Sequence, residues 1–353
     1  MRIGLIGWPG SGKTSLFRAL GGVRSGHSGP TQLTDERAVV SVEVPDARLL
    51  WLRDHFTPKK FTPARIEFVD FPGVPRGNQK GKPELLAAIR EMDALCLVLR
   101  DFTTGNYPYE KPAADAAREF SDLQEELRFN DYAMLSARVE KLDASTKKPS
   151  KTLEKDKLEL AFLQRLLSEF EGQGKDIRDI HMSAEEHQMI RAFQFASQKP
   201  RILLVNAAEG ADAAKAAARV ASSHCVFARI EEEIAGLSAE EKKEFLESYG
   251  LTEPFRDRLI KIGYQTLGLQ SFFTVGEDEV RAWTIKVGDD AVTSAGRIHT
   301  DLARGFIRAE VIGYQDFHDA GNMREVKARN LLRLEAKDYV VKDGDILNIR
   351  FSV

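Results

Sequence analysis

The sequence has little of the chemistry that marks secreted or membrane-spanning proteins. Its 353 residues include only two cysteines, Cys96 and Cys225, which lie far apart and each in an apolar run. Cysteines in such runs are mostly inert core residues, so we expect neither a disulfide framework nor a cysteine metal site. No stretch approaches the roughly eighteen apolar residues of a membrane span, and the apolar start is too short for a signal peptide. We therefore expect a soluble, cytoplasmic protein with no membrane partner.

An excess of one charge sign is also lacking, because 51 lysines and arginines are balanced by 54 aspartates and glutamates. The formal net charge of −3 argues against a protein that coats nucleic acid by bulk charge, so we expect no DNA partner. A local basic patch is compatible with this balance. What the chain does have is length and apolar content: 42% of its residues are hydrophobic, which is enough for two or three domains with sizeable cores.

The strongest motif lies at the N-terminus. An apolar run over residues 3–6 predicts a buried strand, and Gly-Trp-Pro-Gly-Ser-Gly-Lys-Thr over residues 7–14 fits the phosphate-binding loop G-x-x-x-x-G-K-[ST]. The residues that follow have the spacing of a helix. Strand, glycine-rich turn and helix direct backbone N–H groups and the positive end of the helix dipole at a polyphosphate. Lys13 would reach the β- and γ-phosphates, and the hydroxyl of Thr14 would hold Mg²⁺.

A second motif follows at the expected distance along the chain. The stretch over residues 64–73 predicts a strand that ends in Asp70-x-x-Gly73. In P-loop nucleotidases this carboxylate orients a metal-bound water, and the glycine N–H contacts the γ-phosphate. Between the motifs, the loop over residues 21–45 offers Thr31 and Thr34 as candidates to close over the γ-phosphate and Mg²⁺.

The position after Gly73 lacks the usual water-orienting residue. Many GTPases place a glutamine there, whereas this chain has Val74. An apolar side chain cannot orient a water molecule, so this route to hydrolysis is missing.

The base-reading motif is also altered. A strand ending at Asn206 is followed by Ala207, Ala208 and Glu209, which resembles the guanine-reading Asn-Lys-x-Asp of GTPases. Alanine replaces the lysine, and the longer glutamate replaces the aspartate that accepts from both guanine donors. These changes weaken the assignment to guanine without establishing adenine. Residues 224–231 are predicted to form the last strand, with backbone near Ala228 at the base.

The pattern predicts three parts. Apolar residues recur with helical spacing on either side of a polar link at residues 143–151, which predicts an antiparallel helical hairpin with a solvated charged face. Alternating stretches near the C-terminus predict strands of a small α+β domain. The predicted boundaries are 1–112 and 200–270 for an α/β P-loop domain, 113–199 for the inserted hairpin, and 271–353 for the C-terminal domain.

Together these residues resemble the YchF/Obg-like ATPase family. The N-terminal motif, the altered base motif and the helical insertion all look like that family. The C-terminal stretches resemble its ubiquitin-like (β-grasp) TGS domain: Phe272–Ile285, Ala295–Asp301, Gly305–Glu310 and Lys337–Asp345. The resemblance implies a Mg²⁺-dependent nucleotidase that binds ATP at least as well as GTP, associates with the ribosome or ribosomal RNA, and takes part in translation and stress responses.

The resemblance also assigns residues. Thr34 is preferred to Thr31 as the second Mg²⁺ threonine because it stands twelve residues before Asp46, as in the family. Lys13 and Gly73 would take the catalytic roles, and Thr14, Thr34 and Asp70 would hold the metal. The phosphates and the base would be bound by Gly10, Ser11, Gly12, Lys13, Thr14, Ser15, Asn206, Ala207, Glu209 and Ala228.

The chain departs from the family at several positions. Gly10 stands where asparagine is usual, Phe71 and Pro72 replace Ala-Gly, and Leu33 lies near the position of a cysteine linked to redox sensitivity. The family histidine that can replace the glutamine is absent from residues 100–112, and His27 and His55 are the remaining histidines to consider.

Two functions stay open. The first is a slow ATPase, with GTP as an alternative substrate, whose nucleotide state controls docking on a ribosomal or RNA partner. A monomer is favoured. The second is a nucleotide-gated binding module with GTP preference or negligible hydrolysis. A small-molecule kinase is not supported, because we find no arrangement of an acceptor pocket and lid arginines.

Overall fold

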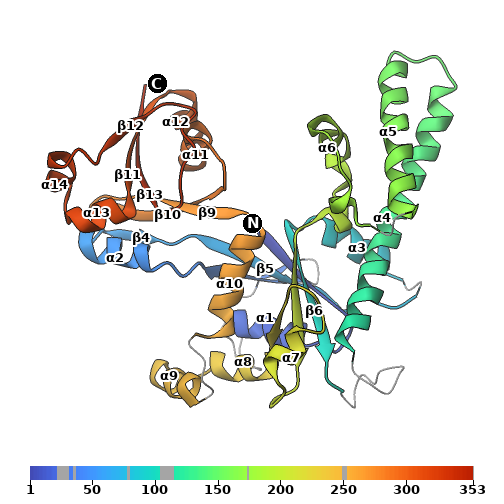
Figure 1. Ribbon diagram of the computed structural model, residues 1–353, viewed down its shortest axis with the longest axis horizontal. Coiled ribbons are helices and arrows are strands. Elements are labelled where there is room, and N and C mark those ends of the chain that lie inside the picture. Colours follow the sequence, from blue (N-terminus) through green and yellow to red (C-terminus); the bar gives the residue numbers. More distant parts are fainter. Residues whose placement is uncertain are drawn as a thin grey trace. The chain divides into compact units, whose positions relative to one another are not determined.

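The computed structural model describes residues 1–21, 32–34, 37–77, 80–103, 115–172, 175–248 and 253–352, with backbone only for residues 32–34, 37 and 239. The chain divides into two compact units. The first contains Met1–Val40 and Phe68–Gly250, and the second contains Ser41–Glu67 and Leu251–Val353. The chain passes between the units inside two continuous strands, β3 and β5 (Figure 1).

The first unit is built on a seven-stranded sheet in the order β2-β3-β5-β1-β6-β7-β8. Strands β1, β6, β7 and β8 pair in parallel, so their carboxyl ends meet at one edge. Strand β6 is buried over seven successive residues, as expected for a central strand covered on both faces. The bounds are β1 Arg2–Ile6, β2 Gln32–Thr34, β3 Arg37–Glu43, β5 Arg65–Asp70, β6 Ala94–Asp101, β7 Arg201–Ala207 and β8 Ser223–Val226.

Short helices follow the strands of this unit. They are α1 Lys13–Gly21, α3 Lys82–Arg90, α7 Ala213–Ala217, α8 Ala228–Ala235 and α9 Ala239–Ser248. One expectation is wrong here: the last strand ends at Val226 rather than continuing to residue 231. Ala228 instead begins α8, because Ile230 and Ile234, four residues apart, are both buried on one helix face.

A helical hairpin is inserted between β6 and β7 (Figure 1). Its arms are α4, Ala116–Thr146, and α5, Leu153–Gly172. The carboxylate of Asp115 caps the first arm by accepting from the backbone N–H groups of Ala117 and Arg118. The hairpin has its own core and is followed by short helices, with α6 at Ala184–Ile190 and 3₁₀ turns at Ile177–Asp179, Arg191–Phe193 and Ala196–Gln198.

The second unit contains a six-stranded sheet in the order β12-β11-β13-β9-β10-β4. Five strands come from the C-terminal region, and β4 comes from the segment between β3 and β5. The strands are β4 Lys60–Thr62, β9 Leu269–Thr274, β10 Glu279–Lys286, β11 Phe306–Gly313, β12 Arg333–Glu335 and β13 Asp345–Phe351. The helices are α2 Ala47–Phe56, α10 Phe255–Thr266, α11 Ala291–Ile298, α12 Thr300–Arg304, α13 Tyr314–Ala320 and α14 Met323–Ala328.

The segment over residues 41–67 is integrated into this second unit. Strand β4 pairs in parallel with β10 at the sheet edge. On α2, Trp51 and Phe56 contact the ring of Phe317. The guanidinium of Arg48 donates to the carboxylates of both Asp46 and Asp343.

Candidate nucleotide-binding site

The loop between β1 and α1 has the backbone that phosphate binding requires. Gly10 has φ of 75° and Gly12 has φ of 94°, both in the left-handed region. Glycine adopts this region at no steric cost, and asparagine tolerates it better than most other residues. At Gly12 a side chain would overlap the amide nitrogen of Asn206, so this position needs glycine for space as well.

Lys13 lies inside the loop. Its side chain is only 5% exposed, and its Nζ donates to the carbonyl oxygens of Trp8 at 2.9 Å and Gly7 at 3.2 Å. Burial lowers the pKa of the Lys13 ammonium to about 8, and the nearby carboxylates of Asp70 and Glu119 oppose this shift. Phosphate oxygens would favour the charged form further, because an opposite charge stabilises the ammonium.

The two motifs meet at Thr14 and Asp70. The hydroxyl of Thr14 donates to Oδ2 of Asp70 at 3.0 Å. Burial raises the pKa of the Asp70 carboxyl, although the hydrogen bond from Thr14 and the charge of Lys13 oppose this shift. The other oxygen, Oδ1, is buried and accepts no hydrogen bond from any described residue. A hydroxyl beside a carboxylate with an unsatisfied buried oxygen is a donor set that fits Mg²⁺.

The second candidate metal threonine is only partly described. The backbone of Thr34 lies in the short strand β2, and its side chain lies outside the described residues. Thr31 lies outside them entirely.

Gly73 packs against the phosphate loop. A Cβ atom at this position would lie 2.6 to 2.8 Å from atoms of Pro9, so only glycine allows the approach. The next backbone N–H, of Val74, donates to the carbonyl of Gly7 at 3.0 Å. The side chain of Val74 is completely buried in the core. This position therefore anchors the segment after β5 to the loop.

The base motif is joined to the loop through Asn206. Its buried side-chain amide donates to the carbonyl of Ser11 at 2.9 Å, and its Oδ1 accepts from the backbone N–H of Ala228 at 3.0 Å. One side chain thus connects the end of β7 to the phosphate loop and to the start of α8. The bridge needs a side chain that both donates and accepts a hydrogen bond, which the amide of asparagine does.

These residues enclose a cavity of about 670 Å³, large enough for a nucleotide. The predicted residues on its wall are Gly10, Gly12, Lys13, Thr14, Ser15, Asn206, Ala207, Glu209 and Ala228. Three other predicted residues contact residues at the site. The backbone carbonyl of Ser11 accepts a hydrogen bond from Asn206, and Asp70 accepts one from Thr14. Gly73 packs against Pro9 of the phosphate loop.

The cavity wall also contains residues that the sequence analysis did not single out. They are Phe102, Thr103, Ala208, Phe227, Arg229 and Ile230. Phe102 directly follows β6, and Phe227 directly follows β8. The available signal was positional, because residues just after parallel strands lie at the same sheet edge as the phosphate loop.

No described residue on the cavity wall is a histidine or glutamine. His55 stacks on Trp51 within the second unit, with ring centroids 4.9 Å apart. His27 and residues 104–112 of the loop after β6 lie outside the described residues.

Comparison with known proteins gives consistent matches. A family model described as a 50S ribosome-binding GTPase matches residues 2–138. A YchF-GTPase C-terminal model, described as a protein of unknown function (DUF933), matches residues 269–352. The chain is 36% identical to the ribosome-binding ATPase YchF of Bacillus subtilis, over 99% of each chain. It is 30% identical to Obg-like ATPase 1 of Bos taurus, covering 100% of this chain and 92% of that one.

A solved structure agrees with these matches. The YchF GTPase of Schizosaccharomyces pombe superposes with a TM-score of 0.85 at 27% identity, covering 99% of this chain and 97% of that one. The predicted fold class is therefore confirmed: a P-loop α/β fold with an inserted helical hairpin and a C-terminal α+β domain of the ubiquitin-like type. Among the described helices, none is both long and apolar enough to cross a membrane.

Proposed function

Because the chain belongs to the YchF/Obg-like ATPase family, we propose that this P-loop NTPase binds ATP with Mg²⁺, also accepts GTP, and hydrolyses the triphosphate slowly. Its nucleotide state would control association with the ribosome or ribosomal RNA, in translation and stress responses. The observation that carries this proposal is the meeting of Thr14 and Asp70 beside the buried Lys13, with one oxygen of Asp70 left without a hydrogen bond.

The phosphate end of the site would work by positioning and charge. Backbone N–H groups of residues 10–15 and the ammonium of Lys13 would hold the phosphate chain, and the N–H of Gly73 would face the γ-phosphate. Thr14, Asp70 and Thr34 would hold Mg²⁺, which neutralises phosphate oxygens when it is bound. Stabilisation of developing charge by fixed donors lowers the barrier without a proton-transferring side chain.

The base end would accept adenine at least as well as guanine. The side chain of Asn206 donates to the carbonyl of Ser11 and accepts from the N–H of Ala228, so its role is to shape the pocket. Ala207 leaves space where GTPases carry a lysine, and Glu209 has the longer side chain. Phe102 and Phe227 add aromatic surface to the same cavity, which suits any flat base.

The rival reading, a binding module with negligible hydrolysis, is favoured by one observation. Val74 is fully buried and anchored, so the position where many GTPases orient the attacking water offers no polar group. The resemblance to the family implies a histidine in place of the water-orienting glutamine, and no described residue on the cavity wall supplies one.

The first test is equilibrium binding of fluorescent ATP and GTP analogues with Mg²⁺, together with multiple-turnover phosphate release. We expect ATP to bind at least as tightly as GTP, and Lys13→Ala to abolish phosphate release. Tenfold tighter GTP binding, about 1.4 kcal/mol, would show that Glu209 still reads guanine. If the wild type releases phosphate no faster than Lys13→Ala, the protein is a nucleotide-gated binding module and not a hydrolase.

Association with the ribosome needs a separate test. Purified ribosomes are sedimented with the protein in the presence of ADP or of a slowly hydrolysed ATP analogue. We expect the bound fraction to differ between the two nucleotides, and equal fractions would contradict control by nucleotide state.

A further inference from the structure

The segment that follows β5, residues 71–77, has no regular secondary structure. Pro72 and Pro75 carry no backbone N–H donor, so this segment cannot be held by a continuous hydrogen-bond ladder. Its position must come from individual contacts. One of these is the bond from Val74 N to the carbonyl of Gly7, close to the point where Gly73 meets Pro9.

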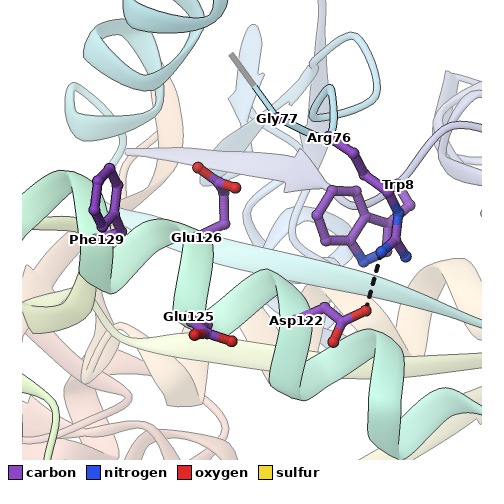
Figure 2. A pocket seen from close by; sticks show the side chains of 7 residues that line it. All are labelled: Trp8, Arg76, Gly77, Asp122, Glu125, Glu126 and Phe129. Carbon is purple, nitrogen blue, oxygen red and sulfur yellow. Dashed lines mark hydrogen bonds and ion pairs between the residues drawn. The ribbon is translucent and has the colours of Figure 1, made fainter.

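A second set of contacts involves Arg76, which lies over the indole ring of Trp8 with its Cζ atom 4.3 Å from the ring centroid. Figure 2 shows the guanidinium beside the indole, with Asp122 of α4 reaching toward it. The Arg76 guanidinium donates to Oδ2 of Asp122 at 3.1 Å. Arg76 therefore links the segment after β5 to a residue of the phosphate loop and to the base of the hairpin.

Trp8 is itself fixed between these elements. It is buried, and its Nε1 donates to the carbonyl of Glu119, in the first turn of α4, at 3.2 Å. A stacked cation and a hydrogen bond at its edge leave the indole little freedom. The ring thus provides a rigid platform for the arginine.

A second connection to α4 lies beside the first. The Nζ of Lys82 donates to the carbonyl of Gly77 at 2.8 Å and pairs with Glu126 at 2.7 Å. Asp122 and Glu126 are four residues apart on one helix, so they lie on the same face one turn from each other. The end of the segment is thus attached to α4 at two successive turns, and Figure 2 shows both carboxylates on that face.

We propose that Arg76 is a positioning residue for triphosphate recognition. Its stack on Trp8 and its ion pair with Asp122 hold the segment so that the N–H of Gly73 faces the γ-phosphate, and they tie that position to α4. This inference rests on the proposed nucleotide site, but it concerns discrimination between triphosphate and diphosphate and does not require hydrolysis. Arg76 is not a catalytic residue, since it contacts the phosphate loop from the side of Trp8.

The test compares the dissociation constants of the full-length protein for ADP and for the β,γ-imido analogue of ATP, both with Mg²⁺. A cation–π contact and an ion pair at a half-exposed site are individually weak, so Arg76→Ala should reduce the preference for the triphosphate about fivefold. The affinity for ADP should not change. Asp122→Asn, which removes the ion pair alone, should reduce the preference about twofold.

Two variants make the result specific. Arg76→Lys keeps the charge beside Asp122 but not the planar stack, so it should restore part of the preference. Arg165→Ala is the matched control: Arg165 also lies over an aromatic ring, Phe162, also pairs with carboxylates, and is 41% exposed against 45% for Arg76. It lies on the hairpin arm α5 and should leave the preference unchanged.

Several outcomes would overturn the inference. They are equal losses of ADP and triphosphate affinity in Arg76→Ala, no loss of either, the same loss in Arg165→Ala, and no triphosphate preference in the wild type. An unchanged preference in Asp122→Asn would overturn the tie to α4. Failure of the proposed hydrolysis would show separately, as absent phosphate release from a protein that still prefers the triphosphate.

Discussion

The side-chain amide of Asn206 occupies the space that a side chain on residue 12 would need. The same amide donates a hydrogen bond to the carbonyl of Ser11 and accepts one from the backbone N–H of Ala228. Glycine at position 12 and asparagine at position 206 therefore depend on each other. This one side chain joins the loop between β1 and α1 to the end of β7 and the start of α8.

This dependence leads to a prediction for Gly12→Ala. The added methyl group must displace Asn206 and is also strained at a φ of 94°. We expect ATP affinity to fall at least about tenfold, or about 1.4 kcal/mol, in a titration with a fluorescent analogue. Gly276→Ala is the control, because the nearest atom to an added Cβ there is 4.0 Å away. Wild-type affinity in Gly12→Ala would contradict the described packing.

The two cysteines should react very differently. Cys96 is fully buried in β6, and burial raises the pKa of its thiol, so almost no thiolate forms near neutral pH. Cys225 is partly exposed in β8. We expect a thiol reagent at pH 8 to modify Cys225 in the native protein and both cysteines after denaturation, as read by mass spectrometry. Modification of both at similar rates in the native state would show that β6 is more open than described.

At the scale of elements, Asp131 connects the hairpin to the chain that returns to the sheet. It is fully buried on α4, and its carboxylate accepts from the backbone N–H groups of Ala196 and Ser197. These donors begin the 3₁₀ turn that precedes β7. The carboxylate thus acts as a cap supplied from a distant part of the sequence.

Removal of this cap should destabilise the protein. Asp131→Ala leaves two buried N–H groups without their acceptor, and we expect a loss of about 2 kcal/mol in unfolding free energy. Urea unfolding followed by circular dichroism measures it. Asp143→Ala on the same helix removes an exposed ion pair with Lys147 and should change stability by less than about 0.5 kcal/mol. Equal effects of the two variants would contradict the capping role.

The elements differ in how far the sequence predicts them. Strand β1 follows from its short apolar run, and the two hairpin arms follow from apolar residues at helical spacing. The prediction extends β8 too far, to residue 231. The helical spacing of α8 becomes visible only when Ile234 follows Ile230 four residues later. Strand β4 has three residues and pairs with β10 far along the chain, so nothing local marks it. The predicted domain boundaries and site roles stay predictions.

At the scale of the whole molecule, the second unit is discontinuous in sequence. The backbone N–H groups of Lys59 and Lys60 donate to the carbonyls of Glu277 and Asp278, and this begins the pairing of β4 with β10. Arg48 adds hydrogen bonds to Asp343, whose carboxylate also accepts from the backbone of Ser271. Residues 41–67 are therefore structural members of the C-terminal unit.

Arg48→Ala tests this membership. It removes hydrogen bonds to Asp46 and Asp343 at a partly exposed site, together worth about 1–2 kcal/mol. The loss should speed amide hydrogen exchange in β4 and lower the melting temperature. Arg304→Ala is the control, because Arg304 in the same unit is exposed and pairs with Asp301 on its own helix α12. Unchanged exchange at Lys60–Thr62 in Arg48→Ala would show that β4 is held by other contacts.

Because the second unit is built from two separate stretches of sequence, no single cut of the chain can separate it intact from the first unit. A truncation or fusion at a single point keeps only one continuous stretch of the sequence. Here a single cut near residue 251 would separate the C-terminal stretch from β4 and α2, leaving the edge of β10 unpaired and Phe317 without the rings of Trp51 and Phe56. Neither fragment would then contain the complete second unit, so we expect the C-terminal fragment to need residues 41–67 for its full stability.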